Sequence, residues 1–265
     1  MKAPFGYGVY AAFTVFILAP LAAIAVMATG KGWFGGRWLP GAWTLKWFSF
    51  ANTAMDIPSL LANSLLIAGL SVVISMGIGV PAAWALARRR VRVRGLLLLL
   101  LLVPRMIPPM SVALGVSREF YYLGLVDTHI GIAIAHSILV VPLVVLVMSA
   151  AFEGLDDHLL EAARVCGANG LQMLWHVVRP LVLPGLLAAT LFAFVTSLNE
   201  FTLTLLTYGP RTITLTIQTY LEISKGFREI ASAISVFLLA PSLILLVVIQ
   251  KYIKPEKLIG GLKGL

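Results

Sequence analysis

The sequence predicts an all-α integral membrane protein with about six transmembrane helices. Hydrophobic residues make up 60% of its 265 residues and charged residues only 12%, whereas soluble domains are about a quarter charged. The mean hydropathy is +0.96, and the apolar residues are gathered into long runs. Such runs must be helical, because an open strand leaves backbone groups unpaired in hydrocarbon. We treat 1–265 as a single membrane domain.

The apolar runs that can span a bilayer are separated by segments rich in charge, glycine or proline. They lie at about 8–29, 61–86, 96–117, 130–150, 184–206 and 231–250. The first begins like a secretory signal peptide, with Lys2 ahead of it. Its apolar stretch nevertheless exceeds the roughly 7–15 residues of such a peptide, so we expect an uncleaved first transmembrane helix at 8–29.

Composition also excludes several classes of protein. So much apolar area has no place on the surface of a soluble enzyme, and the low charge excludes a disordered chain. The lone cysteine, Cys166, cannot form an intrachain disulfide. The net charge of +9 fits cytoplasmic loops and contact with membrane lipid, and we expect no nucleic-acid partner. The four histidines form no H-E-x-x-H pair, so we expect no metal site.

Lysine and arginine residues set the predicted orientation. With a cytoplasmic N-terminus, twelve of the 20 fall inside and seven outside. The inside set is Lys2, Arg88, Arg89, Arg90, Arg92, Arg94, Arg164, Arg179, Lys251, Lys254, Lys257 and Lys263, and the outside set is Lys31, Arg37, Lys46, Arg118, Arg211, Lys225 and Arg228. Both termini are therefore predicted to be cytoplasmic.

The two longer outside loops have features of their own. Residues 30–60 contain four tryptophans, Trp33, Trp38, Trp43 and Trp47, which is typical of a membrane–water interface. Residues 207–230 mix glycine, proline and charge, and we expect a short surface helix there.

The cytoplasmic segment at about 153–180 is too polar to span and too patterned to be a linker. Asp156 or Asp157 is placed to cap a helix that ends near Gly167. A second short helix is expected from about 170 to 178, ending at Pro180. Ala162 and Ala163 leave little bulk on one face of the first helix, and Glu161 adds a charge. A partner protein could approach that face closely, although a helix resting on lipid would show a similar pattern.

This segment resembles the EAA loop of permease subunits of binding-protein-dependent ABC importers. The resemblance rests on Glu161-Ala162-Ala163, then Gly167, then Pro180, with Val177 in place of the usual isoleucine. Arg179 departs from the pattern, because leucine is usual there. The resemblance covers about residues 60–250. It implies the type I importer fold, with a coupling helix that includes Asp157.

The resemblance also implies partners. ATP and Mg would be bound by a separate dimer of ATP-binding cassette subunits. This chain lacks the phosphate-binding G-x-x-x-x-G-K-[ST] loop. It would therefore hold no cofactor and act as a transport subunit rather than an enzyme. A second homologous permease subunit would complete the pathway. A periplasmic or lipid-anchored solute-binding protein would deliver the solute. The location implied is the bacterial cytoplasmic (inner) membrane.

Two charged residues are predicted to lie inside spans, where charges are functional candidates by default. Glu200 follows Asn199 near the outer half of the fifth span, and it either contacts substrate or pairs inside the bundle. Arg105 lies in the run PRMIPP, where prolines should kink or unwind the third span. It either lines the pathway, or pairs with Glu200 or reaches a water-filled cavity.

The C-terminal third resembles the second permease subunit of spermidine/putrescine importers. The runs that carry this are SLNEF at 197–201, YGP at 208–210, TITL at 212–215 and IQTY at 217–220. Asn199 removes one of two usual acids, and Thr216 replaces a usual proline. The implied substrate is polyamine-like, with a phosphonate such as 2-aminoethylphosphonate, iron or an opine as alternatives. A secondary transporter or channel, and a membrane scaffold or enzyme, are the other classes considered.

Overall fold

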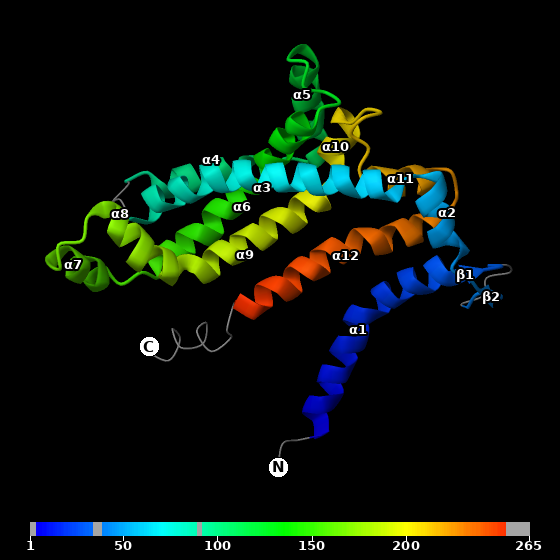
Figure 1. Ribbon diagram of the computed structural model, residues 1–265, viewed down its shortest axis with the longest axis horizontal. Helices are drawn as coiled ribbons and strands as arrows, with labels where there is room; N and C mark the ends of the chain where they lie inside the picture. The colour runs from blue at the N-terminus through cyan, green and yellow to red at the C-terminus, as the bar shows by residue number, and fades with distance from the viewer. Residues whose placement is uncertain (1–3, 34–38, 89–91, 253–265) are drawn as a thin grey trace. The chain divides into compact units, whose positions relative to one another are not determined.

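The computed structural model describes residues 4–33, 39–88 and 92–252 (Figure 1). In this part, five helices are long and apolar enough to cross a membrane, and a bent helix pair makes a sixth candidate. The all-α membrane fold expected from the sequence is therefore confirmed. Several residues used for orientation lie outside the described residues: Lys2, Arg37, Arg89, Arg90, Lys254, Lys257 and Lys263. Trp38 of the tryptophan-rich loop also lies outside them.

The chain divides into two units, each described here by itself. Unit 1 comprises Met1–Asn63 and Ile213–Pro241, and unit 2 comprises Ser64–Thr212 and Ser242–Leu265. Two long helices, α3 (Ile57–Arg88) and α12 (Arg228–Tyr252), contribute residues to both units.

Unit 1 contains the first predicted span and the loop that follows it. Its elements are α1 (Pro4–Thr29), β1 (Gly30–Lys31), β2 (Ala42–Trp43), α2 (Lys46–Ala54), the start of α3, α11 (Leu215–Ser224) and the first part of α12. The hairpin is tied to α2 because the indole Nε1 of Trp47 donates to the Gly30 carbonyl at 2.7 Å. Buried apolar residues of α2, α3, α11 and α12 form one core: Ala51, Ile57, Leu60, Leu215, Ile230 and Ile234.

The short helix expected within residues 207–230 is α11. Its N-cap is Thr214, whose side chain accepts from the backbone N–H of Ile217. The expectation of a surface helix is corrected, however, because Leu215, Ile217 and Glu222 are buried. Leu215 belongs to the core of unit 1 described above.

Unit 2 is built on two long helices that pack side by side, α6 (His129–Glu153) and α9 (Arg179–Leu198) (Figure 1). A Cβ atom on Gly185 would lie 2.5 Å from the Cβ of Ala151, so glycine is needed for this close approach. Val144, Met148, Ala189 and Ala193 form the buried seam, which joins a larger core that includes Leu160. The small residues let two apolar helices approach closely, as they do in membrane bundles.

The predicted third span, 96–117, is broken. It forms α4 (Arg94–Met106) and α5 (Pro109–Tyr122), which meet at an angle of 91°. Pro108 and Pro109 have no backbone N–H, so no helical hydrogen bond can continue through this point. The kink expected from the prolines is confirmed, and the two halves are separate helices.

The predicted fifth span, 184–206, starts earlier and ends earlier than expected. One apolar helical segment runs from Gly170 to Leu198 through α8 (Gly170–Met173), a π-helical turn η1 (Leu174–Val178) and α9. Pro180 therefore does not end a helix, which corrects the sequence expectation. It lies in the first turn of α9, directly after the π turn, where the hydrogen-bonding pattern of the helix changes. After Leu198 the chain breaks, and α10 (Thr202–Thr207) follows.

Candidate functional site

The helix expected to couple to a partner is α7 (Asp157–Val165). Asp156 is its N-cap and accepts from the N–H of His158 at 2.9 Å. Gly167 has φ +80°, a left-handed conformation that glycine adopts without strain, and it ends the helix as predicted. Asn169 and Gln172 then form a reciprocal capping box that starts α8. Side chains at both ends thus fix the length of α7.

One face of α7 is anchored to the bundle. Leu160 is buried in the core of unit 2 with Leu155. The Arg88 guanidinium, at the end of α3, is ion-paired with the Asp157 carboxylate, and its Nη1 donates to the Leu155 carbonyl at 3.2 Å. Trp84 lies under this guanidinium, 5.9 Å from it. Arg88 therefore joins the end of one long helix to the start of α7.

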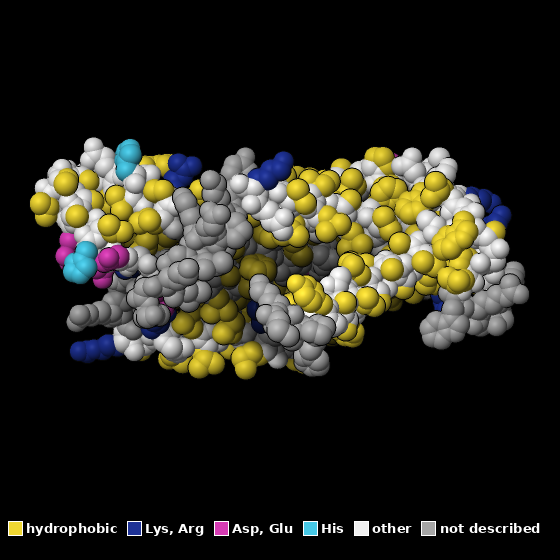
Figure 2. Space-filling view, turned by 90° about the horizontal axis from the view of Figure 1, so that it is seen from below, with side chains coloured by type: hydrophobic (Ala, Val, Ile, Leu, Met, Phe, Trp, Pro, Cys, Tyr) yellow, Lys and Arg dark blue, Asp and Glu magenta, His cyan; other side chains and the backbone are white. Residues whose placement is uncertain are grey.

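The rest of the α7 surface is open. The side chain of Glu161 is 68% exposed, Ala162 is exposed and Val165 is 88% exposed. Ala163 is only half-buried. Figure 2 shows acidic and histidine side chains gathered over α7, at the left of the view. This face carries one acid, small residues and an apolar side chain, which is a suitable surface for a protein partner.

A hollow of about 260 Å³ lies beside this open face. Trp84, Arg88, Asp157, Leu160, Glu161, Arg164 and Met173 line it. The hollow is polar at its rim and apolar at its base, since Leu160 is buried and the two acids are exposed. The arrangement can accept a projecting side chain from a partner while α7 itself stays fixed to the bundle.

Glu200 lies between α9 and α10, not within a helix. Its carboxylate caps α10 by accepting from the N–H of Leu203 at 3.0 Å and from the N–H of Thr204 at 3.1 Å. The side chain is 8% exposed. A carboxylate at a helix N-terminus is stabilised by the exposed N–H groups there. These contacts fit the alternative in which Glu200 is a structural acid paired inside the bundle.

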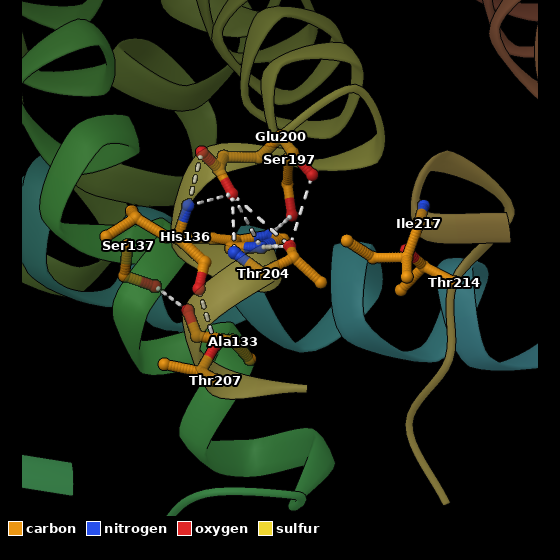
Figure 3. Close-up of polar contacts among 10 residues, drawn as sticks. Ala133, His136, Ser137, Ser197, Glu200, Thr204, Thr207, Thr214 and Ile217 are labelled. Carbon is orange, nitrogen blue, oxygen red and sulfur yellow. Dashed lines mark hydrogen bonds and ion pairs between the residues drawn. The ribbon is translucent and has the colours of Figure 1, made fainter. Parts of the chain in front are cut away.

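A buried histidine completes the surroundings of Glu200 (Figure 3). The His136 ring contacts the Ser197 hydroxyl through Nδ1 and the Thr204 hydroxyl through Nε2, each at 2.8 Å. Nε2 also lies 3.4 Å from the Glu200 carboxylate. We call His136, Ser197, Glu200 and Thr204 the polar cluster. Because its members come from α6, α9, α10 and the break before α10, it fixes the broken end of the fifth span.

Arg105 lies elsewhere, in the last turn of α4 just before the 91° break. It is exposed, and its Nη1 donates to the Leu139 carbonyl of α6 at 3.0 Å. Among the described residues Arg105 has no ion pair with Glu200, so the contacts do not support the alternative in which these two residues pair. Asn199 is exposed and donates to the Val195 carbonyl of its own helix at 2.8 Å. The structure therefore does not bring Arg105, Asn199 and Glu200 together into one site.

Comparison with protein families decides the identity of the chain. A family model described as "Binding-protein-dependent transport system inner membrane component" matches residues 75–258, which is more than half of the sequence. The chain belongs to this family. The permease resemblance seen in the EAA loop is therefore confirmed.

Individual relatives of this permease cover most of its length. It is 30% identical to SmoH of Agrobacterium fabrum, a sulfoquinovosyl glycerol transport system permease protein, over 86% of this chain and 81% of SmoH. It is 25% identical to PotC of Escherichia coli, a spermidine/putrescine transport system permease protein, over 92% of this chain and 91% of PotC. A bacterial ABC transporter for alginate import has the same fold, with a TM-score of 0.69 at 24% identity over 96% of this chain and 99% of that one.

Family membership fixes the broad role. The chain is a multi-pass permease of the inner membrane and a component of an ABC transporter, and it is not an enzyme. Membership also supports the expectation that this subunit carries no cofactor of its own.

Several residues of these sites were not foreseen. His136 was considered only as a metal ligand, because its partners Ser197 and Thr204 lie more than sixty residues away in the sequence. The run 88–94 was interpreted mainly as a topology signal, yet Arg88 pairs with Asp157 and Arg94 pairs with Glu153. The basic run at 88–94 and the acidic residues at 153–161 are predicted on the same side of the membrane, and this was the signal that could have suggested these pairs.

Proposed function

We propose that this permease converts ATP hydrolysis in a partner into import of a small polar solute, and that α7 is where the partner acts. The observation that supports this most directly is that one part of the α7 surface is anchored to the bundle while another part is open. Leu160 and Asp157 hold α7 to the bundle, while Glu161 and Ala162 face outward. A rigidly anchored helix with a free docking face can transmit a push, because its motion requires motion of the bundle.

The residues proposed for ATPase coupling are those of the EAA resemblance. Glu161 would pair with a basic residue of the ATPase, and Ala162 and Ala163 would allow close approach. Gly167 would set the end of the docking helix, and Asp157 would hold its start. Pro180 would act within the continuous segment 170–198 and not as a helix end.

The assembly proposed has three kinds of partner. A dimer of ATP-binding cassette subunits binds ATP and Mg, a second homologous permease completes the pathway, and a periplasmic or lipid-anchored binding protein delivers the solute. Solved structures with the same fold include a bacterial ABC transporter that imports alginate and an alginate ABC transporter in complex with an alginate pentasaccharide-bound periplasmic protein. We propose that both termini are cytoplasmic, that 1–265 is one membrane domain and that 60–250 is its permease core.

The substrate class is the finer part of the proposal. A polyamine-like solute is supported by the likeness to PotC over 92% of this chain. Glu200 gives this class less support than the sequence suggested, because its carboxylate is engaged in capping α10. A glycoside is the second candidate, supported by the 30% identity to SmoH. Arg105, Asn199 and Glu200 remain proposed pathway residues, with exposed Arg105 the best placed to meet a solute.

Reconstitution tests this function. The complex would be placed in proteoliposomes with ATP inside and each solute outside with its binding protein. The solutes tested would be spermidine, a glucoside, glucuronate, 2-aminoethylphosphonate, ferric citrate and octopine. ATP-dependent uptake of one class supports the proposal. Equal uptake with and without ATP would instead indicate a secondary transporter or channel.

A further inference from the structure

Unit 1 contains a cavity of about 650 Å³ that none of the sites above uses. This volume is in the range of roughly 300–1,000 Å³ that is usual for small-molecule sites. One wall comes from α2 and the residue after it, and the other from α11, the turn after it and α12. The lining residues are Lys46, Trp47, Phe50, Ala54, Met55, Gln218, Glu222, Lys225, Phe227 and Ile230.

A buried carboxylate forms the polar side of this cavity. Glu222 is 1% exposed, and its Oε1 accepts from Gln218 Nε2 at 2.9 Å and from Lys225 Nζ at 2.8 Å. Both bonds reach the same oxygen. The Gln218 amide and the Lys225 ammonium each carry further donors. Acceptors and donors therefore lie side by side along one face of α11, which is the arrangement that neighbouring hydroxyl groups require.

The charge of the cavity argues against a cationic ligand. Glu222 is neutralised by Lys225, and Lys46 adds a further positive charge from the first turn of α2. A polyamine would meet two ammonium groups and a carboxylate that is already paired. A neutral polyol is tolerated here, and an acidic substituent gains from Lys46.

Aromatic rings complete the cavity. Trp47 is held in place because its Nε1 donates to the Gly30 carbonyl at 2.7 Å, so its ring is a rigid wall. Phe50 and Phe227 are 43% and 51% exposed, and they line the same space. Flat apolar rings beside hydrogen-bonding groups suit a ligand with an apolar ring face and a polar edge, as a pyranose has.

We propose that this cavity binds an acidic pyranoside, a six-membered sugar ring that carries a carboxylate or sulfonate. Its hydroxyls would bond to Glu222, Gln218 and Lys225, its C–H face would lie on Trp47, and its acid would pair with Lys46. Both walls belong to loops that the charge pattern places outside the cell. The site therefore faces the compartment where solute arrives, and its meaning as a substrate site rests on the proposed import function.

Binding to the intact complex in nanodiscs tests this site without ATP. Glucuronate, methyl α-glucopyranoside and spermidine would be titrated by isothermal calorimetry. We expect both sugars to bind and spermidine not to compete with them for this cavity. Lys46→Gln should weaken the binding of glucuronate roughly tenfold or more, because one charge-assisted hydrogen bond is lost. The same variant should change the affinity for methyl α-glucopyranoside less than about threefold. The matched control Lys31→Gln, an exposed lysine that does not line the cavity, should change neither.

A second set of variants tests the rest of the cavity. Glu222→Gln and Phe50→Ala should weaken both sugars, whereas Glu229→Gln and Leu45→Ala, which are outside the lining, should not. If Glu222→Gln does not fold, Phe50→Ala, which changes an exposed side chain, still tests the cavity. Displacement of glucuronate by spermidine, or an equal effect of Lys46→Gln on both sugars, would overturn the proposal.

The site and the import function fail in different ways. ATP-driven uptake by a wild-type complex that binds neither sugar would exclude this site and leave the import function standing. Sugar binding that Lys46→Gln weakens, in a complex with no ATP-driven uptake of any solute, would support the site and exclude the import function.

Discussion

The guanidinium of Arg88, in the last turn of α3, is ion-paired with the carboxylate of Asp157, in the first turn of α7. This pair connects a long membrane helix to the proposed docking helix. The Arg88 side chain is 14% exposed and that of Asp157 is 76% exposed. An ion pair with one partner so exposed adds under about 1 kcal/mol to stability, so its main effect should be on coupling.

The first prediction concerns this pair. Arg88→Ala should lower ATP-driven uptake severalfold while the melting temperature of the purified complex changes by only a few degrees, because contacts to Asp157 and Leu155 are lost but the core is not. ATPase activity and uptake would be measured on the same proteoliposomes. Arg92→Ala, a nearby exposed arginine, is the control. The exchange Arg88→Asp with Asp157→Arg should restore part of the uptake, and no restoration would contradict a direct role for the pair.

A second prediction concerns the open face of α7. Glu161→Lys should reduce co-purification of the ATP-binding subunit at least tenfold, because a reversed charge would face the basic partner proposed for it. Glu119→Lys, at an exposed acid on α5, should leave co-purification unchanged. Wild-type association and uptake in Glu161→Lys would show that the partner docks elsewhere.

Gly167 provides a third prediction. Its φ of +80° costs a residue with a side chain about 1 kcal/mol, and nothing within 4 Å would contact an added Cβ. Gly167→Ala should therefore disturb only the end of α7 and reduce the uptake obtained per ATP hydrolysed. Gly170→Ala, also without close neighbours and with ordinary φ, is the matched control. Equal behaviour of the two variants would exclude the left-handed turn as the cause.

A fourth prediction tests the polar cluster. His136→Ala removes a ring that contacts two buried hydroxyls and lies beside Glu200, and it should destabilise the protein by about 2–4 kcal/mol. Thermal unfolding of the purified permease would measure this. Ser137→Ala, the next residue of α6, loses only a bond to the Ala133 carbonyl and should have a much smaller effect. A melting temperature unchanged in His136→Ala would show that the cluster is not structural.

The fifth prediction separates Glu200 from Arg105. Glu200→Ala should lower stability by about 1 kcal/mol or more, because α10 loses its cap, and it should not change which solute is preferred. Arg105→Gln should leave stability nearly unchanged and alter uptake, because the Arg105 side chain is exposed at the break. Competition uptake assays and thermal unfolding of both variants provide the comparison. A changed preference in Glu200→Ala would show that this acid also selects the solute.

Much of this fold could be predicted because lipid imposes simple rules. A run of about 20 apolar residues must form a helix, and proline residues mark where it breaks. Asp156 and Gly167 marked both ends of α7 because capping and left-handed turns have strong residue preferences. Local chemistry was therefore sufficient for the helices and for the docking segment.

Other features depend on contacts between distant residues. The π turn before Pro180 could not be predicted, because a proline in sequence usually signals a helix end and only the packed helix shows that it continues. The sequence predicts Glu200 to be a pathway acid because the predicted fifth span, 184–206, continues too far past Leu198. His136 is buried against Ser197 and Thr204, which lie more than sixty residues away in the sequence. Glu222 is buried although its hydrogen-bond partners, Gln218 and Lys225, are close to it in the sequence. Burial of polar groups is a tertiary property.

The continuous segment from Gly170 to Leu198 has a mechanical consequence. It is 29 residues long, and at about 1.5 Å per residue it forms a rod of roughly 40 Å. One end carries the capping box beside α7, and the other ends at the polar cluster. If the segment moves as one body, a tilt of about 10° around one end displaces the other by roughly 7 Å over that length. A small rotation at the end beside α7 would thus reach the opposite end as a displacement larger than one helical turn.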